Sequence, residues 1–252
     1  YTGGAHMVYG EALQVDGRIL AITDRHGSRF IVQLCCYKAS GTGASGHASQ
    51  EDIMNDLNLT NPFRSLVAAL EKRDEYTAGH DQRTKLIALD IGEQCSLEAE
   101  ELAILEIAAS VHDIGKIGIP DRILLKPGRL DAEEWKVMKT HPEHGFLILS
   151  TVESPYASSV ANVVRYHHEA FDGSGYPDGK RSEDIPVLSR IIALADCYDA
   201  MATSRPYRQG KPHGFIMKVI HEDNEYKYDP YLREKLVNCL ENSPLRAQQA
   251  EI

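Results

Sequence analysis

The sequence of 252 residues predicts a mainly α-helical protein of about seven or eight helices, preceded by a small β-rich segment. From Asp52 onward, long segments with helical spacing of apolar residues are separated by short loops that contain Gly and Pro. Strand-like apolar runs occur only earlier in the chain. With 42% hydrophobic residues, a chain of this length can bury a substantial core.

The N-terminal segment carries the β signal. Two short apolar runs, 18–22 and 30–34, flank a polar stretch and predict a β-hairpin. Residues 39–49 are rich in Gly, Ser, Thr and Ala, as in a flexible linker. We therefore expect a small β-containing segment with its linker over 1–50 and a larger helical domain over 51–252.

The helical body is predicted element by element from apolar periodicity and from Gly and Pro positions. Ser96 is expected to cap one helix, and Asp131 with Glu134 has the spacing of a capping box. The expected helices are Pro62–Tyr76, His80–Cys95, Leu97–His112, one beginning after Asp131, Pro155–Glu169, Pro186–Thr203, Phe215–Asp223 and Pro230–Leu240.

Composition excludes several classes of function. A formal net charge of −10 argues against non-specific binding to long nucleic acid, which requires many cations facing phosphates. No run of 18 apolar residues and no signal-peptide pattern is present, so we expect no membrane segment. Five scattered cysteines without CxxC spacing indicate a reduced, cytoplasmic setting.

The most informative motif follows an apolar helical run that ends at Val111. His112, Asp113 and Lys116 stand directly after that run, and a helical pitch would place His112 and Lys116 on one face. Burying three such groups without partners would cost several kcal/mol, so a metal or a phosphate is a natural partner. The alternative is a solvated helix end with a chance His-Asp pair.

Other candidate ligands are His80, His141, the pair His167-His168, and Asp196. A single buried histidine is more often a hydrogen-bonded core residue than a ligand, and the histidine pair fits an exposed helix end. Asp196 is harder to dismiss, because a carboxylate within an apolar helical run is rarely tolerated unless it is paired or binds a metal.

These residues stand in an ordered series of motifs. From about Phe63 to Leu240 the sequence resembles the HD-GYP family of cyclic dinucleotide phosphodiesterases. The resemblance rests on residues 73–80 (RDEYTAGH), 112–120 (HDIGKIGIP), 124–128 (LLKPG), 141–143 (HPE), 167–169 (HHE), 172–179 (DGSGYPDG), 195–196 (AD) and 205–208 (RPYR). The similarity to the family's motifs weakens after Arg208, and the region before Asp52 resembles no recognisable family.

The resemblance implies that residues 51–252 form a catalytic domain, an HD-type helical bundle with two divalent metal ions. One metal would be held by His80, His112, Asp113 and Asp196, and the other by Asp113, His141, His167 and His168, with Asp113 bridging. Family members with a third metal carry a glutamate where this chain has Tyr76, so two metals are expected. Iron is the expected metal and manganese the alternative, while zinc or nickel could also occupy such a site.

The expected reaction is hydrolysis of cyclic di-GMP, or of mixed cyclic GMP-AMP, to the linear dinucleotide, and the sequence does not decide whether that product is cleaved further to GMP. Two metals would lower the pKa of a bridging water and yield the attacking hydroxide. Lys116 would stabilise charge that develops on the phosphate. The resemblance assigns substrate binding to Gly175 and Tyr176, and Arg205 and Arg208 would grip phosphate through paired hydrogen bonds.

Two alternatives stay open from the sequence. One is a cyclic dinucleotide receptor that binds without useful turnover and signals through protein partners or a homodimer. The other is an HD-type phosphohydrolase of another nucleotide, which would need the metals but neither the Gly-Tyr-Pro loop nor the paired arginines. The sequence does not separate the two cyclic dinucleotides, because base recognition depends on side chains that no motif fixes.

Overall fold

The computed structural model describes residues 14–15, 19–23, 29–33, 62–73, 77–204, 209–223, 226–241 and 243–247. The chain forms two compact units, Tyr1–His47 and Ala48–Ile252. The functional assignment of 1–50 and 51–252 as segment and catalytic domain stays a prediction.

The described residues of the first unit form an antiparallel sheet of three strands in the order β1-β2-β3. The strands are β1 (Gln14–Val15), β2 (Ile19–Thr23) and β3 (Arg29–Gln33), and Leu20 pairs with Val32 in the register of β2 and β3. The two apolar runs of the sequence supply β2 and β3. Most of this unit lies outside the described residues, so its wider architecture stays a prediction.

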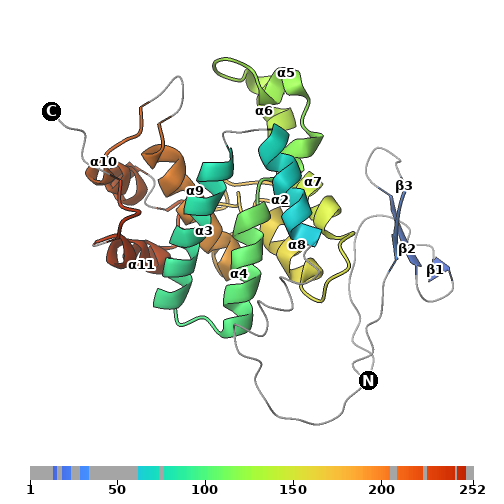
Figure 1. Cartoon of the computed structure of the whole chain (residues 1–252), viewed down its shortest axis with the longest axis horizontal. Helices are drawn as coiled ribbons and strands as arrows, with labels where there is room; N and C mark the ends of the chain where they lie inside the picture. Colours follow the sequence, from blue (N-terminus) through green and yellow to red (C-terminus); the bar gives the residue numbers. More distant parts are fainter. Residues whose placement is uncertain are drawn as a thin grey trace, which may run out of the picture. The chain divides into compact units, whose positions relative to one another are not determined.

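The described residues of the second unit form helices joined by loops, which confirms the mainly α class, although they contain more α-helices than the seven or eight expected (Figure 1). Two 3₁₀ helices and a π-helical turn also occur there: η1 (Ile114–Gly118), η2 (Ser182–Asp184) and η3 (Val219–Asp223). The α-helices are α2 (Pro62–Arg73), α3 (Thr77–Gln94), α4 (Ala99–Val111), α5 (Asp121–Leu124), α6 (Ala132–Met138), α7 (His141–Leu149), α8 (Ala157–Arg165), α9 (Val187–Ala202), α10 (His213–Lys218) and α11 (Pro230–Leu240).

Helix α3 is central to this unit because it packs against both α4 and α9 (Figure 1). Helix α4 is apolar nearly all round, as expected of a helix enclosed by its neighbours, and Leu105 and Ala108 on it are fully buried. Helices α8 and α9 are tied by the hydroxyl of Ser189, which donates to the carbonyl of Val163 over 2.8 Å. The core therefore holds α3 and α9, which carry His80 and Asp196, and the ends of α4 and α8, which directly precede other candidate site residues.

Of the two helix caps predicted from the sequence, one is confirmed and the other is wrong. Asp131 caps α6 in a full capping box with Glu134, as its spacing predicts. The prediction for Ser96 is wrong: this residue has φ = 56° and follows the end of α3, while Glu98 caps α4. A left-handed backbone at Ser96 is incompatible with the extended N-cap conformation, so the chain reverses there before α4 starts.

The segment after α4 does not continue as an α-helix. Val111 is the last α-helical residue, and η1 follows, so Lys116 is not placed by a regular α-helical pitch. Gly115 explains how η1 reaches α7, because a Cβ there would lie 1.8 Å from the carbonyl oxygen of His141 and 2.5 Å from the nitrogen of Gly145. Only a residue without a side chain permits this approach, which brings the end of α4 close to His141.

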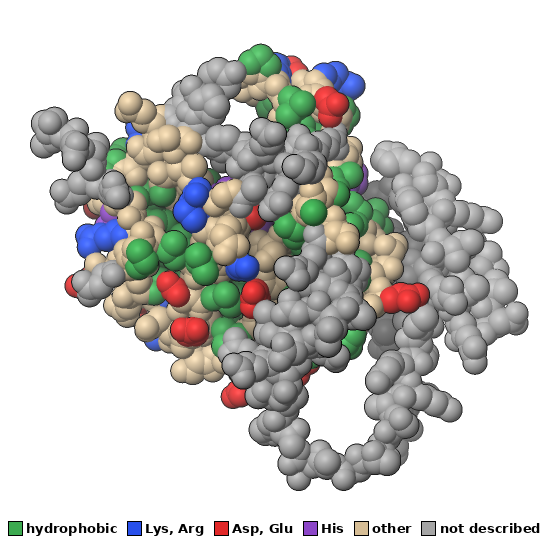
Figure 2. Space-filling view, viewed as in Figure 1, with side chains coloured by type: hydrophobic (Ala, Val, Ile, Leu, Met, Phe, Trp, Pro, Cys, Tyr) green, Lys and Arg blue, Asp and Glu red, His purple; other side chains and the backbone are tan. Residues whose placement is uncertain are grey.

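The surface carries charges of both signs. Figure 2 shows Lys and Arg side chains interspersed with Asp and Glu over the described part of one face. None of the helices in the described residues combines the length and apolarity that crossing a bilayer requires.

The burial of Leu105 gives a stability prediction. Replacing Leu105, which is 0% exposed and leaves no room for a Cβ at Gly92 of α3, with Ala should lower the free energy of unfolding by about 2–5 kcal/mol, because the cavity cannot close fully. Urea unfolding followed by circular dichroism measures the change. The control is Leu147→Ala on α7, where the side chain is 42% exposed and the loss should be below about 1 kcal/mol. Equal losses for both variants would contradict the assigned core.

Candidate metal centre

Five histidines and two aspartates that the sequence singles out converge in the helical unit. Neighbouring imidazole rings form a continuous chain, with centroids 4.0–5.9 Å apart. All but two of the seven side chains are less than 9% exposed. The set comprises His80 on α3, His112 and Asp113 after α4, His141 at the start of α7, His167 and His168 after α8, and Asp196 on α9.

Three of the histidines share one hydrogen-bond pattern. The Nδ1 atoms of His112, His141 and His167 each lie 2.6–2.9 Å from the backbone carbonyl oxygen three residues earlier. A carbonyl oxygen only accepts, so each Nδ1 must carry the proton. In the neutral ring the other nitrogen, Nε2, is then a bare lone pair. This tautomer is the one in which Nε2 can bind a metal ion.

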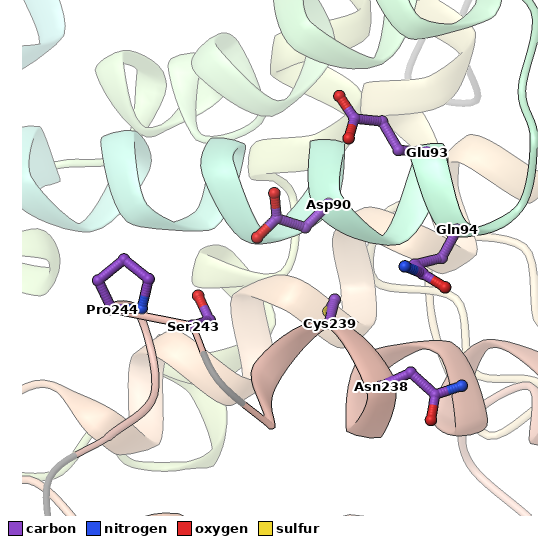
Figure 3. Close-up of a pocket in the computed structure, with 7 residues that line it drawn as sticks. All are labelled: Asp90, Glu93, Gln94, Asn238, Cys239, Ser243 and Pro244. Atoms are coloured by element: carbon purple, nitrogen blue, oxygen red, sulfur yellow. The ribbon is translucent and has the colours of Figure 1, made fainter.

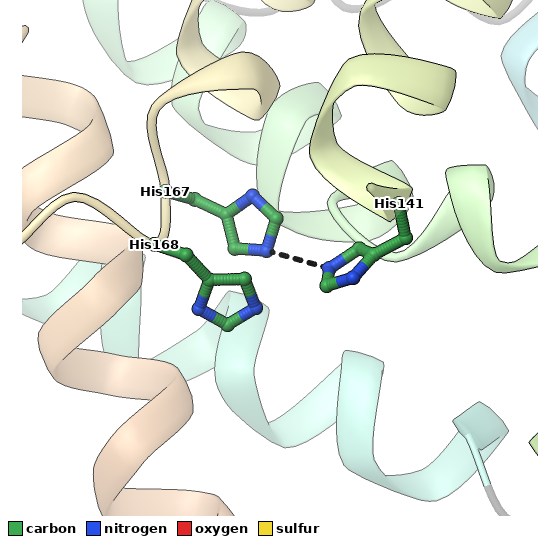
Figure 4. Close-up of side chains that lie close together, drawn as sticks. All are labelled: His141, His167 and His168. Atoms are coloured by element: carbon green, nitrogen blue, oxygen red, sulfur yellow. Dashed lines mark hydrogen bonds between the residues drawn. The ribbon is translucent and has the colours of Figure 1, made fainter. Parts of the chain in front are cut away.

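The unprotonated nitrogens meet inside the protein. His141, His167 and His168 form a group of possible metal ligands, and Figure 4 shows their rings converging from α7 and from the segment after α8. The Nε2 atoms of His141 and His167 are 3.4 Å apart. Since both Nδ1 atoms already hold the ring proton, neither neutral ring has a hydrogen to give the other. Burial lowers the pKa of His141 to about 4 and that of His167 to about 3, so protonation does not relieve this contact near neutrality.

A second group of possible ligands contains His80, Asp81, His112 and Asp113, with one ligand atom of each lying within 4.8 Å of the others. All four side chains are buried. The Nε2 atom of His112 has no hydrogen-bond partner, although it is enclosed by protein. The bare Nε2 atoms of His112, His141 and His167, together with the carboxylates beside them, fit a divalent cation in both groups.

Asp113 lies between the two groups. Its Oδ1 is 3.4 Å from Nε2 of His141, and its Oδ2 is 3.7 Å from Nε2 of His112. Lys116 donates a short hydrogen bond to the same Oδ2. Burial alone would raise the pKa of this carboxyl, but Lys116 and the surrounding histidines hold the pKa of Asp113 well below its usual range. Asp113 is thus an anion that faces both groups.

His80 differs from the other histidines because carboxylates face both of its nitrogens. Nδ1 is 2.7 Å from Oδ2 of Asp199, and Nε2 is 2.9 Å from Oδ1 of Asp196. Although burial opposes protonation, the hydrogen bonds to Asp196 and Asp199 raise the pKa of His80 to about 10. Asp196 is therefore close to the second group, even though the tighter cluster includes Asp81 instead.

Sequence reasoning missed the residues that support His80. Arg83 donates from Nε to Oδ1 of Asp199 over 2.7 Å and from Nη2 to Oδ2 over 3.2 Å. The same Nη2 donates to the hydroxyl of Thr203 over 2.6 Å. A signal was present, since Arg83 follows His80 by one helical turn and Asp199 follows Asp196 by another, and each pair therefore shares a helix face.

The loop with the Gly-Tyr-Pro sequence is anchored by Glu169, which is 4% exposed. Its Oε1 accepts from the backbone nitrogens of Asp178 and Gly179 over 2.7 and 3.0 Å, and its Oε2 accepts from Lys180 over 3.1 Å. Gly175 packs so tightly on the backbone that a Cβ would lie 2.2 Å from the nitrogen of Ala170. The loop is therefore held directly against the residues that follow α8.

This anchoring places Tyr176 beside the first group. Its backbone nitrogen donates to the carbonyl of His168 over 3.1 Å, and the two rings lie 4.9 Å apart at 33°. The ammonium of Lys139 is 5.8 Å from the centre of the Tyr176 ring. Arg205, Arg208 and Tyr76 lie outside the described residues, so their parts in the site stay predictions.

A separate hollow lies at the other end of α3. Figure 3 shows its lining from α3, α11 and the segment that follows α11. None of the predicted site residues takes part in it. The lining residues are Asp90, Glu93, Gln94, Asn238, Cys239, Ser243 and Pro244.

Comparison with known proteins identifies the family. The sequence profile of the HD domain family matches residues 64–232, which is more than half of the chain. The chain therefore belongs to the HD domain family.

Two curated relatives and one solved structure illustrate the similarity. The chain is 41% identical over 165 residues to the cyclic di-GMP phosphodiesterase response regulator RpfG of Xanthomonas campestris pv. campestris (strain 8004), covering 66% of this chain and 44% of that protein. It is 35% identical over 188 residues to 3′3′-cGAMP-specific phosphodiesterase 2 of Vibrio cholerae serotype O1, covering 74% and 36%. The chain thus spans less than half the length of these relatives.

The structure is similar to Bd1817, described as an HDG"Y"P protein from Bdellovibrio bacteriovorus, with a TM-score of 0.56 and 19% identity. This match covers 77% of the chain and 62% of that protein. At this level of identity the likeness concerns the fold alone. The helical arrangement therefore agrees with the HD fold that the sequence resemblance implies.

The three bonds at Glu169 give a test of loop anchoring. Glu169→Gln should free the Gly-Tyr-Pro loop, because an amide NH₂ would face a backbone N–H that now donates to a carboxylate oxygen. The local cost should be about 1–3 kcal/mol. Hydrogen exchange of the amides of Asp178, Gly179 and Lys180 should accelerate at least about fivefold. Glu183→Gln, at an exposed position, is the control, and unchanged exchange in Glu169→Gln would refute the anchoring role.

Proposed function

We propose that this protein is a metal-dependent phosphodiesterase of the HD-GYP type that hydrolyses cyclic di-GMP to the linear dinucleotide. The observation that carries this proposal is the convergence of buried histidines whose Nε2 atoms are free of protons around the carboxylate of Asp113. The relatives named as cyclic di-GMP and cGAMP phosphodiesterases support the substrate class. Mixed cyclic GMP-AMP is the alternative substrate.

Two divalent metals are proposed to bind at the two groups. One metal would be bound by the imidazoles of His141, His167 and His168, and Asp113 would be shared with the other metal. The other metal would also be bound by His80, His112 and Asp196. The mixed imidazole and carboxylate donors suit Fe(II) first and Mn(II) second, while Zn(II) or Ni(II) would also bind. When bound, such ions would lower the pKa of water and offset charge that develops on the phosphate.

Lys116 is proposed to act on the substrate through charge. Its ammonium lies at the Asp113 carboxylate and thus at the boundary of the two groups. There it would hold a phosphate oxygen or stabilise the departing 3′ oxygen during cleavage. Its hydrogen bond to Asp113 also fixes the orientation of that carboxylate towards the histidines.

The remaining residues are proposed to bind the nucleotide. Tyr176 stands against His168, so its ring can contact a base or ribose next to the metals. Gly175 lets the loop pack close enough to Ala170 for this placement, because any side chain would push the loop away from the Ala170 backbone. Arg205 and Arg208 would grip the phosphates. These cations, together with metals that outweigh the carboxylates, would make the site locally positive in a protein of net charge −10.

The bridging role of Asp113 predicts the effect of its removal. Asp113→Ala should remove at least one metal per chain and reduce hydrolysis of cyclic di-GMP by more than about a hundredfold, because both metals lose a shared anion. Elemental analysis and chromatography of products measure the two effects. The matched control is Asp184→Ala, which removes an exposed carboxylate. Retained activity with full metal content in Asp113→Ala would contradict the proposal.

A turnover assay on the metal-loaded protein tests the activity itself. Cyclic di-GMP, mixed cyclic GMP-AMP and mononucleotides are compared at equal concentration. Multiple turnovers of a cyclic dinucleotide support the phosphodiesterase, whereas tight binding without turnover would indicate a receptor. Preferred hydrolysis of mononucleotides would identify a phosphohydrolase of another kind.

A further inference from the structure

Asp81 is a buried carboxylate to which the expected ligand set gives no role. It lies in the first turns of α3, directly after His80, and only 5% of its surface is exposed. Its Oδ1 has no hydrogen-bond partner in the part of the chain that the structure describes. An enclosed carboxylate oxygen without a partner is costly, and natural proteins seldom retain one without a compensating interaction.

The described neighbours of Asp81 offer its Oδ1 no hydrogen bond, since both nitrogens of His80 already face Asp196 and Asp199. One ligand atom of Asp81 lies within 4.8 Å of ligand atoms of His80, His112 and Asp113. His112 presents a second unpartnered atom, Nε2. This nitrogen carries no proton, because the ring proton is on Nδ1 and is donated to the carbonyl of Ala109. A carboxylate oxygen and a bare imidazole nitrogen have no hydrogen bond to make with each other. A cation between them would satisfy both atoms at once.

We infer that Asp81 is a ligand of the divalent cation that His80, His112 and Asp113 also hold. This inference rests on the proposed function, since it concerns one of the two metals assigned there. It adds a carboxylate to that metal's donors. The metal near α3 would then have an oxygen-rich donor set, whereas the metal at His141, His167 and His168 would have a nitrogen-rich one.

The difference in donors has a consequence for metal choice. Carboxylate oxygens suit Mn(II) and other hard cations, while imidazoles also suit Zn(II), Ni(II) and Cu(II). The site with Asp81 should therefore retain Mn(II) better than the other site when Zn(II) competes. A protein with two unlike sites can hold two different metals, which a symmetric pair of sites would not do.

A competing role for Asp81 is that of a counter-ion. Lys116 is close enough to interact electrostatically with Asp81 as well as with Asp113 and Asp196. In that role Asp81 would balance the charge of Lys116 and touch no metal. The two roles differ in what happens to metal binding when the carboxylate is removed, and in whether residue 81 can bond to the metal itself.

The first experiment measures Mn(II) binding by the electron paramagnetic resonance signal of free Mn(II). Asp81→Asn keeps the size of the side chain and removes its charge. We expect one of the two equivalents to bind at least about tenfold more weakly, while the other is unchanged. The matched control is Glu93→Gln, which removes one charge from an exposed position on the same helix. Two unchanged equivalents in Asp81→Asn would overturn the inference.

The second experiment reports direct contact and does not depend on affinity. Asp81→Cys, loaded with Co(II), should show a thiolate-to-cobalt charge-transfer absorption that the Co(II)-loaded parent lacks, since only a coordinated thiolate produces it. Circular dichroism verifies that each variant is folded. A folded, cobalt-loaded Asp81→Cys protein without this absorption would refute direct coordination. It would leave the counter-ion role.

Failure of the inference is distinguishable from failure of the proposed function. If the parent chain binds no divalent metal, and His167→Ala behaves as the parent does, the proposed metal centre itself is wrong. If the parent binds two equivalents and His167→Ala loses one, the centre stands. Asp81→Asn and Asp81→Cys then decide the role of Asp81 alone.

Discussion

The structure of the site depends on where three backbone carbonyls lie. Each carbonyl accepts the Nδ1 hydrogen of a histidine three residues later, so His112, His141 and His167 are fixed as the tautomer with a bare Nε2. The helix ends supply these carbonyls, because the last carbonyls of a helix lack a partner within the helix. The same hydrogen bonds that complete α4 and α8 therefore direct two imidazoles inward as acceptors. The tautomer is a consequence of helix termination.

Close backbone packing brings these helix ends together. At Gly115 the segment after α4 touches the first turn of α7, and at Gly175 the loop lies on the backbone of residues 168–170. A methyl group at either position would overlap backbone atoms, which cannot move as a flexible side chain can. Asp113 and His141 meet because of the first contact, and Tyr176 meets His168 because of the second. The donors on separate elements are thus positioned by main-chain packing.

The sequence predicts the helical class and most helix positions because apolar periodicity and Gly and Pro positions record which face is buried. It also indicates the seven candidate ligands, through residue type and through motif resemblance. It does not predict the backbone after Val111, where a 3₁₀ turn replaces the α-helix, because that change depends on contact with α7. Helical spacing relates Arg83 to His80 and Asp199 to Asp196, but the contacts that Asp199 makes with Arg83 and His80 join residues 116 and 119 positions apart, and helical spacing does not specify such contacts.

Burying so many acceptors connects metal binding to folding. Lone pairs that face one another, as at His141 and His167, raise the free energy of the folded chain without a cation and are satisfied when one binds. A ligand that binds only the folded state stabilises it by mass action. A bound cation would therefore offset the free-energy cost of burying these donors next to one another. The hydrophobic core around α3, α4 and α9 must supply the stability that holds the donors in place beforehand. The packing of the apolar helices therefore maintains the geometry of the donor side chains that the polar centre requires.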